Sequence, residues 1–91
     1  MAKITDDMLN DLYKTLTSLT NEQDCKDLLN DLCTHKEIEN MAQRICAAKL
    51  LMKCETYIQV TEKTGIASAT LARVSDALKY GEGYKKILNK L

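Results

Sequence analysis

The 91-residue sequence predicts a single all-helical (all-α) domain that spans residues 1–91. The chain has no proline, only three glycines and no phenylalanine or tryptophan, a composition that favours helix over sheet. Apolar residues make up 45% of the chain and charged residues 29%, as is typical of a protein that folds. A chain of this length holds about one domain.

A first helix is expected from Thr5, which can cap it, to about Leu19. Asp6 and Asp7 lie in its first turn, where carboxylates oppose the positive end of the helix dipole. Apolar residues recur along it at helical spacing and give it one broad apolar face: Met8, Leu9, Leu12, Tyr13, Leu16 and Leu19.

A second helix can be capped by Thr20 or Asn21 and carries apolar residues at Leu28, Leu29 and Leu32. Its other side carries Asp24, Asp27 and Asp31. Spacings of three and four residues fit a solvated helix face better than a metal site or an acid–base cluster.

A third, longer helix is expected to begin at a capping box formed by Thr34 and Glu37 and to reach Met52 or Lys53. His35, the only histidine, lies in its first turn, where a surface position is expected. The helix carries two apolar stripes: Ile38, Met41, Ala42, Ile45, Cys46 and Met52 in one, and Ala47, Leu50, Leu51 and Cys54 in the other. Such a helix must be covered on more than one side, so residues 1–54 are expected to form the interface of a homodimer.

Residues 56–80 carry the pattern of a helix-turn-helix. Thr56 can cap a short helix over 57–64 that ends at Gly65, a natural residue for a left-handed C-terminal position. Ser68 can cap a second helix that runs from Ala69 to about residue 80 and ends at Gly81. Two short helices joined by a tight turn that contains glycine define this motif.

The interior of the motif is expected to contain six apolar side chains that interlock where the two helices cross: Ile58, Val60, Ile66, Leu71, Val74 and Leu78. After Gly81 and Gly83, a last short helix is expected over residues 84–91, with Lys85, Lys86 and Lys90.

The second helix of such a motif lies in the major groove of DNA and presents its N-terminal residues to the bases. The expected DNA-binding residues are Ala67, Ser68, Ala69, Thr70 and Arg73 at base edges, with Gln59 and Lys63 at phosphates. Helix-turn-helix units also occur as plain packing motifs, and only Arg73 and Lys79 are basic on the second helix. A helical protein-interaction module without DNA affinity therefore stays open as the alternative.

Charge is divided unevenly along the chain, although the formal net charge is zero. Residues 1–40 hold four lysines and nine acidic residues, whereas residues 41–91 hold nine basic and four acidic residues. The basic half indicates an anionic partner, with double-stranded DNA the first candidate. The longest apolar stretch, from Ile45 to Met52, is far shorter than the roughly 20 residues of a membrane span. With no export signal at the N-terminus, we expect a soluble, cytoplasmic protein with no membrane partner.

The four cysteines do not follow the spacing of a metal site. Cys25, Cys33, Cys46 and Cys54 are separated by gaps that match no zinc motif, and we expect them to be small, partly buried apolar residues. The sequence also lacks a glycine-rich phosphate loop and a nucleophile paired with a base. It therefore predicts no enzyme, no metal and no cofactor.

Several segments resemble a known family: 32–38, Met41 to Arg44, Ala48 to Leu51, the run from Glu62 to Val74, and 78–84. They are similar to the Trp-repressor-like family and, more closely, to its YerC/YecD branch. The resemblance extends from about Leu12 to Leu88. It implies an intertwined, all-helical homodimer that presents two helix-turn-helix units to DNA as a transcriptional regulator.

The resemblance also implies where a ligand pocket would lie. In tryptophan-sensing members two arginines sandwich the indole, and a serine on the recognition helix helps to hold the amino acid. Counting from Gly65 puts these positions on Gln43, Arg73 and Ala77. Glutamine lacks the charge and planar stacking of a guanidinium, and alanine lacks a hydroxyl, so no response to tryptophan is expected. Arg44, one position along, is rotated by about 100° and is expected to point elsewhere.

Overall fold

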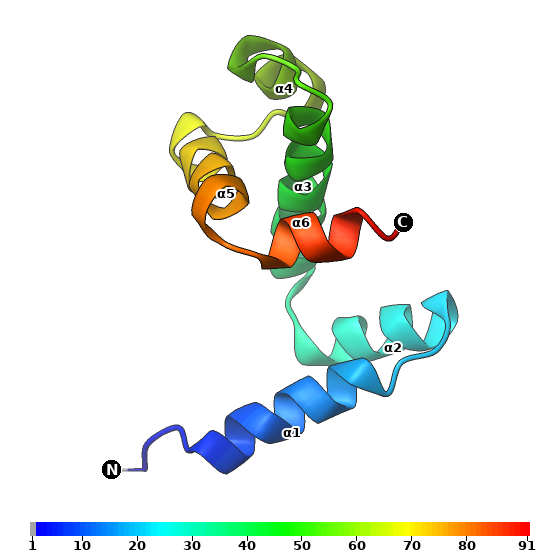
Figure 1. Cartoon of the computed structure of the whole chain (residues 1–91). Helices are drawn as coiled ribbons and strands as arrows, with labels where there is room; N and C mark the ends of the chain where they lie inside the picture. Colours follow the sequence, from blue (N-terminus) through cyan, green and yellow to red (C-terminus); the bar gives the residue numbers. More distant parts are fainter. Residues whose placement is uncertain (1) are drawn as a thin grey trace. The chain divides into compact units, whose positions relative to one another are not determined.

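The computed structural model describes residues 2–91, and within this range it contains six helices and no strand, which confirms the all-α prediction. The helices are α1 (Asp6–Thr17), α2 (Glu22–Leu32), α3 (His35–Met52), α4 (Tyr57–Thr64), α5 (Ser68–Tyr80) and α6 (Gly83–Leu88) (Figure 1). The chain divides into two compact units, the first ending at His35 and the second spanning Lys36–Leu91.

The first unit consists of α1 and α2. The Thr5 hydroxyl accepts a hydrogen bond from the Met8 amide at 3.2 Å, and the Asn21 side chain accepts one from the Asp24 amide at 2.8 Å. Asn21 rather than Thr20 is therefore the second cap, and α1 ends at Thr17, before the expected Leu19. Neither helix contains a buried residue, so the apolar face of α1 is exposed within one chain.

The second unit has a small core shared by α3, α4 and α5. Its buried residues are Ala47, Ala48, Val60, Ile66, Leu71, Val74 and Leu78, with Tyr84 and Leu88 of α6 packed against them. The two alanines lie in the C-terminal half of α3 and are fully buried in this core. Figure 1 shows α3, α4 and α5 as the helices of this unit that precede α6. Five of the six expected interior residues are buried, but Ile58 is 73% exposed. The prediction was wrong there because two positions on a helix differ by about 200°, which puts Ile58 opposite the buried Val60.

The connection between α3 and α4 is tightly hydrogen-bonded. Cys54 adopts a left-handed backbone with φ 65°. Its amide donates to the Leu51 carbonyl at 2.9 Å, and the Glu55 amide donates to the Leu50 carbonyl at 3.2 Å. These two bonds form a Schellman motif that ends α3.

The helix-turn-helix follows the predicted bounds closely. Thr56 caps α4 as expected, and α4 ends at Gly65, whose φ of 71° is left-handed. The N-cap of α5 is Ala67 and not Ser68, because Ala67 has the extended backbone and Ser68 is already helical. No side chain caps α5.

In the C-terminal segment, α5 ends at Gly81 as expected, and only the last helix differs from expectation. Gly81, the C-cap of α5, has an extended backbone with φ −93°. A Cβ added there would lie 2.8 Å from the Ala77 carbonyl oxygen, so the absence of a side chain permits this close approach. The last helix begins at Gly83 and ends at Leu88, three residues before the predicted end at residue 91.

Three further findings concern function classes. Between residues 2 and 91, no three or more His, Cys, Asp or Glu side chains are grouped so that they could hold a metal ion. None of the helices in this range has the length and the hydropathy of a membrane-spanning segment. Cys25 and Cys33 are half-buried as expected, whereas Cys46 and Cys54 are exposed, and all four are free thiols.

Candidate nucleic-acid interface

The N-terminal end of α5 presents a surface of small side chains. Ala67, Ser68 and Ala69 are all exposed, and the helix behind them is anchored by the buried Leu71 and Val74. Because no side chain caps this helix, its first amides remain available to an external acceptor. A rigid helix end with short side chains can approach another molecule closely and donate hydrogen bonds to it.

Thr70 and Arg73 follow on the same helix and both line a cavity. Thr70 is half-buried and Arg73 is exposed. With Arg44, Val74, Ala77 and Tyr84, they line a cavity of about 140 Å³. Arg73 is thus exposed near the start of α5 and also lines this small cavity.

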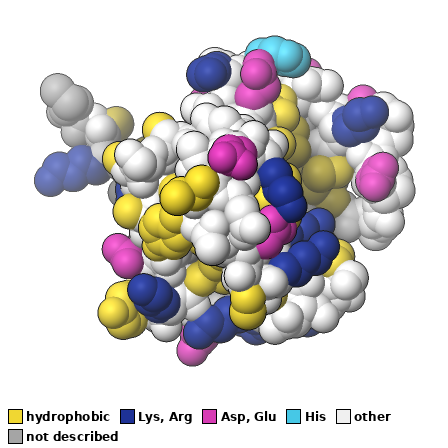
Figure 2. Space-filling model, turned by 90° about the horizontal axis from the view of Figure 1, so that it is seen from above, with side chains coloured by type: hydrophobic (Ala, Val, Ile, Leu, Met, Phe, Trp, Pro, Cys, Tyr) yellow, Lys and Arg dark blue, Asp and Glu magenta, His cyan; other side chains and the backbone are white. Residues whose placement is uncertain are grey.

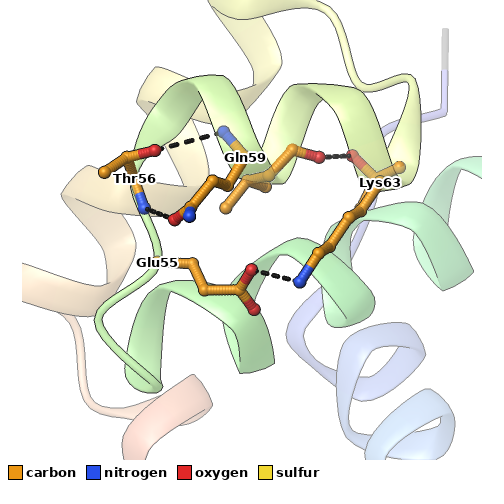
Figure 3. Close-up of polar contacts among 6 residues, drawn as sticks. Glu55, Thr56, Gln59 and Lys63 are labelled. Carbon is orange, nitrogen blue, oxygen red and sulfur yellow. Dashed lines mark hydrogen bonds and ion pairs between the residues drawn. The ribbon is translucent and has the colours of Figure 1, made fainter.

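Gln59 and Lys63, the expected phosphate contacts, are both engaged within the chain (Figure 3). The Gln59 side-chain oxygen accepts a hydrogen bond from the Thr56 amide at 2.8 Å, and the Thr56 hydroxyl accepts one from the Gln59 amide at 3.2 Å. The Lys63 ammonium forms an ion pair with the Glu55 carboxylate. Sequence reasoning missed Glu55 because this residue precedes α4, and an ion pair across eight positions has no helical spacing to reveal it.

Gln43 and Arg44 occupy different surfaces from those expected. The Gln43 side-chain amide donates to the Thr64 carbonyl at 2.9 Å, and Gln43 lines a separate polar cavity with Lys36, Asn40 and Lys63. Arg44, which was expected to point elsewhere, lines the cavity that contains Arg73 and Ala77. The rotation of about 100° between neighbouring residues does separate the two side chains, but their positions are the reverse of those expected. Gln43 lies at the end of α4 and Arg44 lies beside α5.

A larger apolar hollow lies beside this cavity, between α3, α5 and α6. Its volume is about 450 Å³, and it is lined by Ile45, Ala77, Gly81, Gly83, Tyr84, Ile87 and Leu88. Figure 2 shows that hydrophobic side chains reach the surface between charged ones.

Comparison with known proteins gives consistent matches over nearly the whole chain. Residues 7–91 match the family model described as Trp repressor protein. The chain is 34% identical over 84 residues to the uncharacterised protein YerC of Bacillus subtilis strain 168, a match that covers 91% of this chain and 81% of YerC.

Two solved structures are similar in fold and in sequence. The crystal structure of a candidate Trp repressor from Staphylococcus aureus gives a TM-score of 0.90 at 31% identity, over 94% of this chain and 87% of that one. A TrpR-like protein from Eubacterium eligens ATCC 27750 gives a TM-score of 0.87 at 34% identity, over 94% and 89% of the two chains.

Proposed function

Because this chain belongs to the Trp repressor family, in the branch that includes YerC, we propose that it is a sequence-specific transcriptional regulator that binds double-stranded DNA as a homodimer. Members of the family are regulatory DNA-binding proteins, so the chain is not an enzyme. The relatives named above are bacterial, and bacterial DNA lies in the cytoplasm, which is where we place this regulator.

The exposed start of α5 is the observation that carries the proposal. Ala67, Ser68 and Ala69 let the helix approach the floor of the major groove, because none has a long side chain. The Ser68 hydroxyl can bond a base or a phosphate, the Ala69 methyl can meet a thymine methyl, and Arg73 can reach a guanine. The uncapped amides of α5 add donors suited to a phosphate.

A two-fold dimer sets the spacing of the DNA site. Two recognition helices that enter successive major grooves lie one duplex turn apart, about 34 Å. The preferred sequence would then be a pseudo-palindrome with half-site centres about 10 bp apart.

Selection from a random duplex pool at low salt, followed by titration of the selected sequence, tests the proposal. We expect Arg73→Ala to weaken binding by about 1–3 kcal/mol and to relax preference at one position in each half-site. Lys79→Ala is the matched control, because it removes one positive charge from the last turn of the same helix. A folded dimer that retains no duplex, or equal losses for the two variants, would contradict this assignment of roles.

A protein-interaction module is the second candidate, and the exposed start of α4 favours it. Ile58 is 73% exposed and Tyr57 is 49% exposed, and an apolar pair of this kind suits a protein partner better than a phosphate backbone. The salt dependence of duplex binding separates the two candidates. Retention of duplex that weakens steeply with salt supports the regulator, whereas no retention at any salt concentration supports the module.

A further inference from the structure

Glu55 is held in a fixed position between α3 and α4. Its amide donates to the Leu50 carbonyl at 3.2 Å, and on the next residue the Thr56 amide donates to the Gln59 side chain at 2.8 Å. The backbone is thus hydrogen-bonded on both sides of Glu55, by the end of one helix and the start of the next. The backbone that carries its carboxylate is therefore fixed at the start of α4.

This carboxylate holds the single basic side chain of α4. Lys63 is the only lysine or arginine between Tyr57 and Thr64, and its ammonium contacts Glu55 (Figure 3). The Glu55 side chain is only 18% exposed, whereas that of Lys63 is 57% exposed. Lys63 lies in the last turn of α4, two residues before Gly65. Gly65 begins the connection to the N-terminal end of α5.

We propose that Glu55 competes with DNA phosphate for Lys63 and thereby lowers the part of DNA binding that does not depend on sequence, an inference that rests on the proposed function. When Lys63 turns to a phosphate, it leaves behind a largely buried carboxylate that has lost its partner. That carboxylate also lies close to the incoming phosphate, and like charges repel. Both effects reduce the binding free energy that the contact between Lys63 and a DNA phosphate would otherwise provide.

The consequence is a lower affinity for every duplex, with the preference between sequences unchanged. Phosphate contacts support binding to every sequence, whereas base contacts at α5 support binding to one. An ion pair that weakens only a phosphate contact leaves the discrimination between bases unchanged. Glu55 therefore weakens binding to unrelated DNA and to the preferred site alike, without removing Lys63 from the surface.

Glu55→Gln tests the inference, with Glu62→Gln as the matched control. Glu62 is an exposed carboxylate on α4, so both variants remove one negative charge from the motif, but only the first releases Lys63. Dissociation constants are measured against salt for the preferred duplex and for a scrambled one. We expect Glu55→Gln to tighten both duplexes about two- to fivefold more than Glu62→Gln at low salt. We also expect its salt slope to be steeper by about one.

The double variant Glu55→Gln/Lys63→Gln shows whether the effect passes through Lys63, and it should lose the gain. If thermal denaturation shows that Glu55→Gln does not fold, Glu55→Asp replaces it in the test. Aspartate keeps the charge, but its side chain is one methylene shorter, so it should also release Lys63. Equal behaviour of Glu55→Gln and Glu62→Gln, or a gain that persists in the double variant, overturns the role of Glu55 while the proposed function stands. Failure of the wild type and every variant to bind any duplex overturns both.

Discussion

Neighbouring side chains on α3 serve different surfaces. Gln43 bonds the carbonyl at the end of α4, and Arg44 lines the cavity with Arg73. The placement by resemblance counted back from Gly65 without a gap, and this count runs through the connection between α3 and α4. A difference of one residue in that connection moves the register of α3 by one position, or about 100°. The face of a helical residue is therefore predictable from a motif only where the intervening turns have equal lengths.

The corrected position of Arg44 changes the reason for expecting no tryptophan response, but not the expectation. Two arginines now line one cavity, yet Ala77 offers no hydroxyl to help hold the amino acid. We expect no saturable binding of L-tryptophan at micromolar concentration. The chain has no tryptophan, so the fluorescence anisotropy of the added amino acid measures binding without background.

Ala77→Ser is the companion variant, because it restores the hydroxyl and leaves Arg44 and Arg73 in place. Saturable binding of tryptophan by the wild type, as tight as that of Ala77→Ser, would contradict the prediction.

The exposure of side chains could be predicted where it depends on local sequence. The small side chains at the start of α5 were predicted from the motif, and all three are exposed. The engagement of Lys63 by Glu55 and of Gln59 by Thr56 depends on how the chain folds between α3 and α4. A tally of charged residues does not reveal which charges already have partners.

At the scale of elements, the two glycines around the start of α6 have different roles. Gly81→Ala should lower the free energy of unfolding by about 1–3 kcal/mol, because backbone atoms of α5 cannot move away from the added carbon. Gly83→Ala is the matched control, since nothing lies within 4 Å of a Cβ there. It should be neutral or should stabilise by about 0.4–1 kcal/mol. Urea unfolding followed by circular dichroism measures both, and equal effects would show that the close approach at Gly81 has no energetic weight.

Helix positions were predictable because caps and glycines act locally. Thr5, Thr56 and Gly65 end or begin helices as expected. Errors arose where tertiary packing decides, as at Ile58, or where the choice lay between adjacent residues, as at Ala67 and Ser68. The early end of α6 at Leu88 coincides with Asn89, its C-cap, a helix-end signal that the prediction did not use.

At the scale of the whole molecule, the exposed apolar residues of α1 predict an obligate dimer. Met8 and Tyr13 are more than half exposed in one chain, and the helix has no buried residue. Sedimentation at micromolar concentration should therefore report about twice the 10.3 kDa mass of the chain. Leu12→Lys should shift the species toward the monomer, whereas Asn10→Lys adds the same charge beside it and should not. A folded, cooperative wild-type monomer would rule out the dimer.

Because α1 and α2 contain no buried side chain, the DNA-binding activity of the protein should depend on the concentration of the chain. If a second chain supplies the missing contacts, each tenfold dilution removes about 1.4 kcal/mol from the stability of the assembly. Below the dissociation constant of the dimer, its concentration varies with the square of that of the chain. Halving synthesis then leaves about a quarter of the DNA-binding species by mass action. At low occupancy, binding to an operator would then rise with the square of expression and not in direct proportion to it.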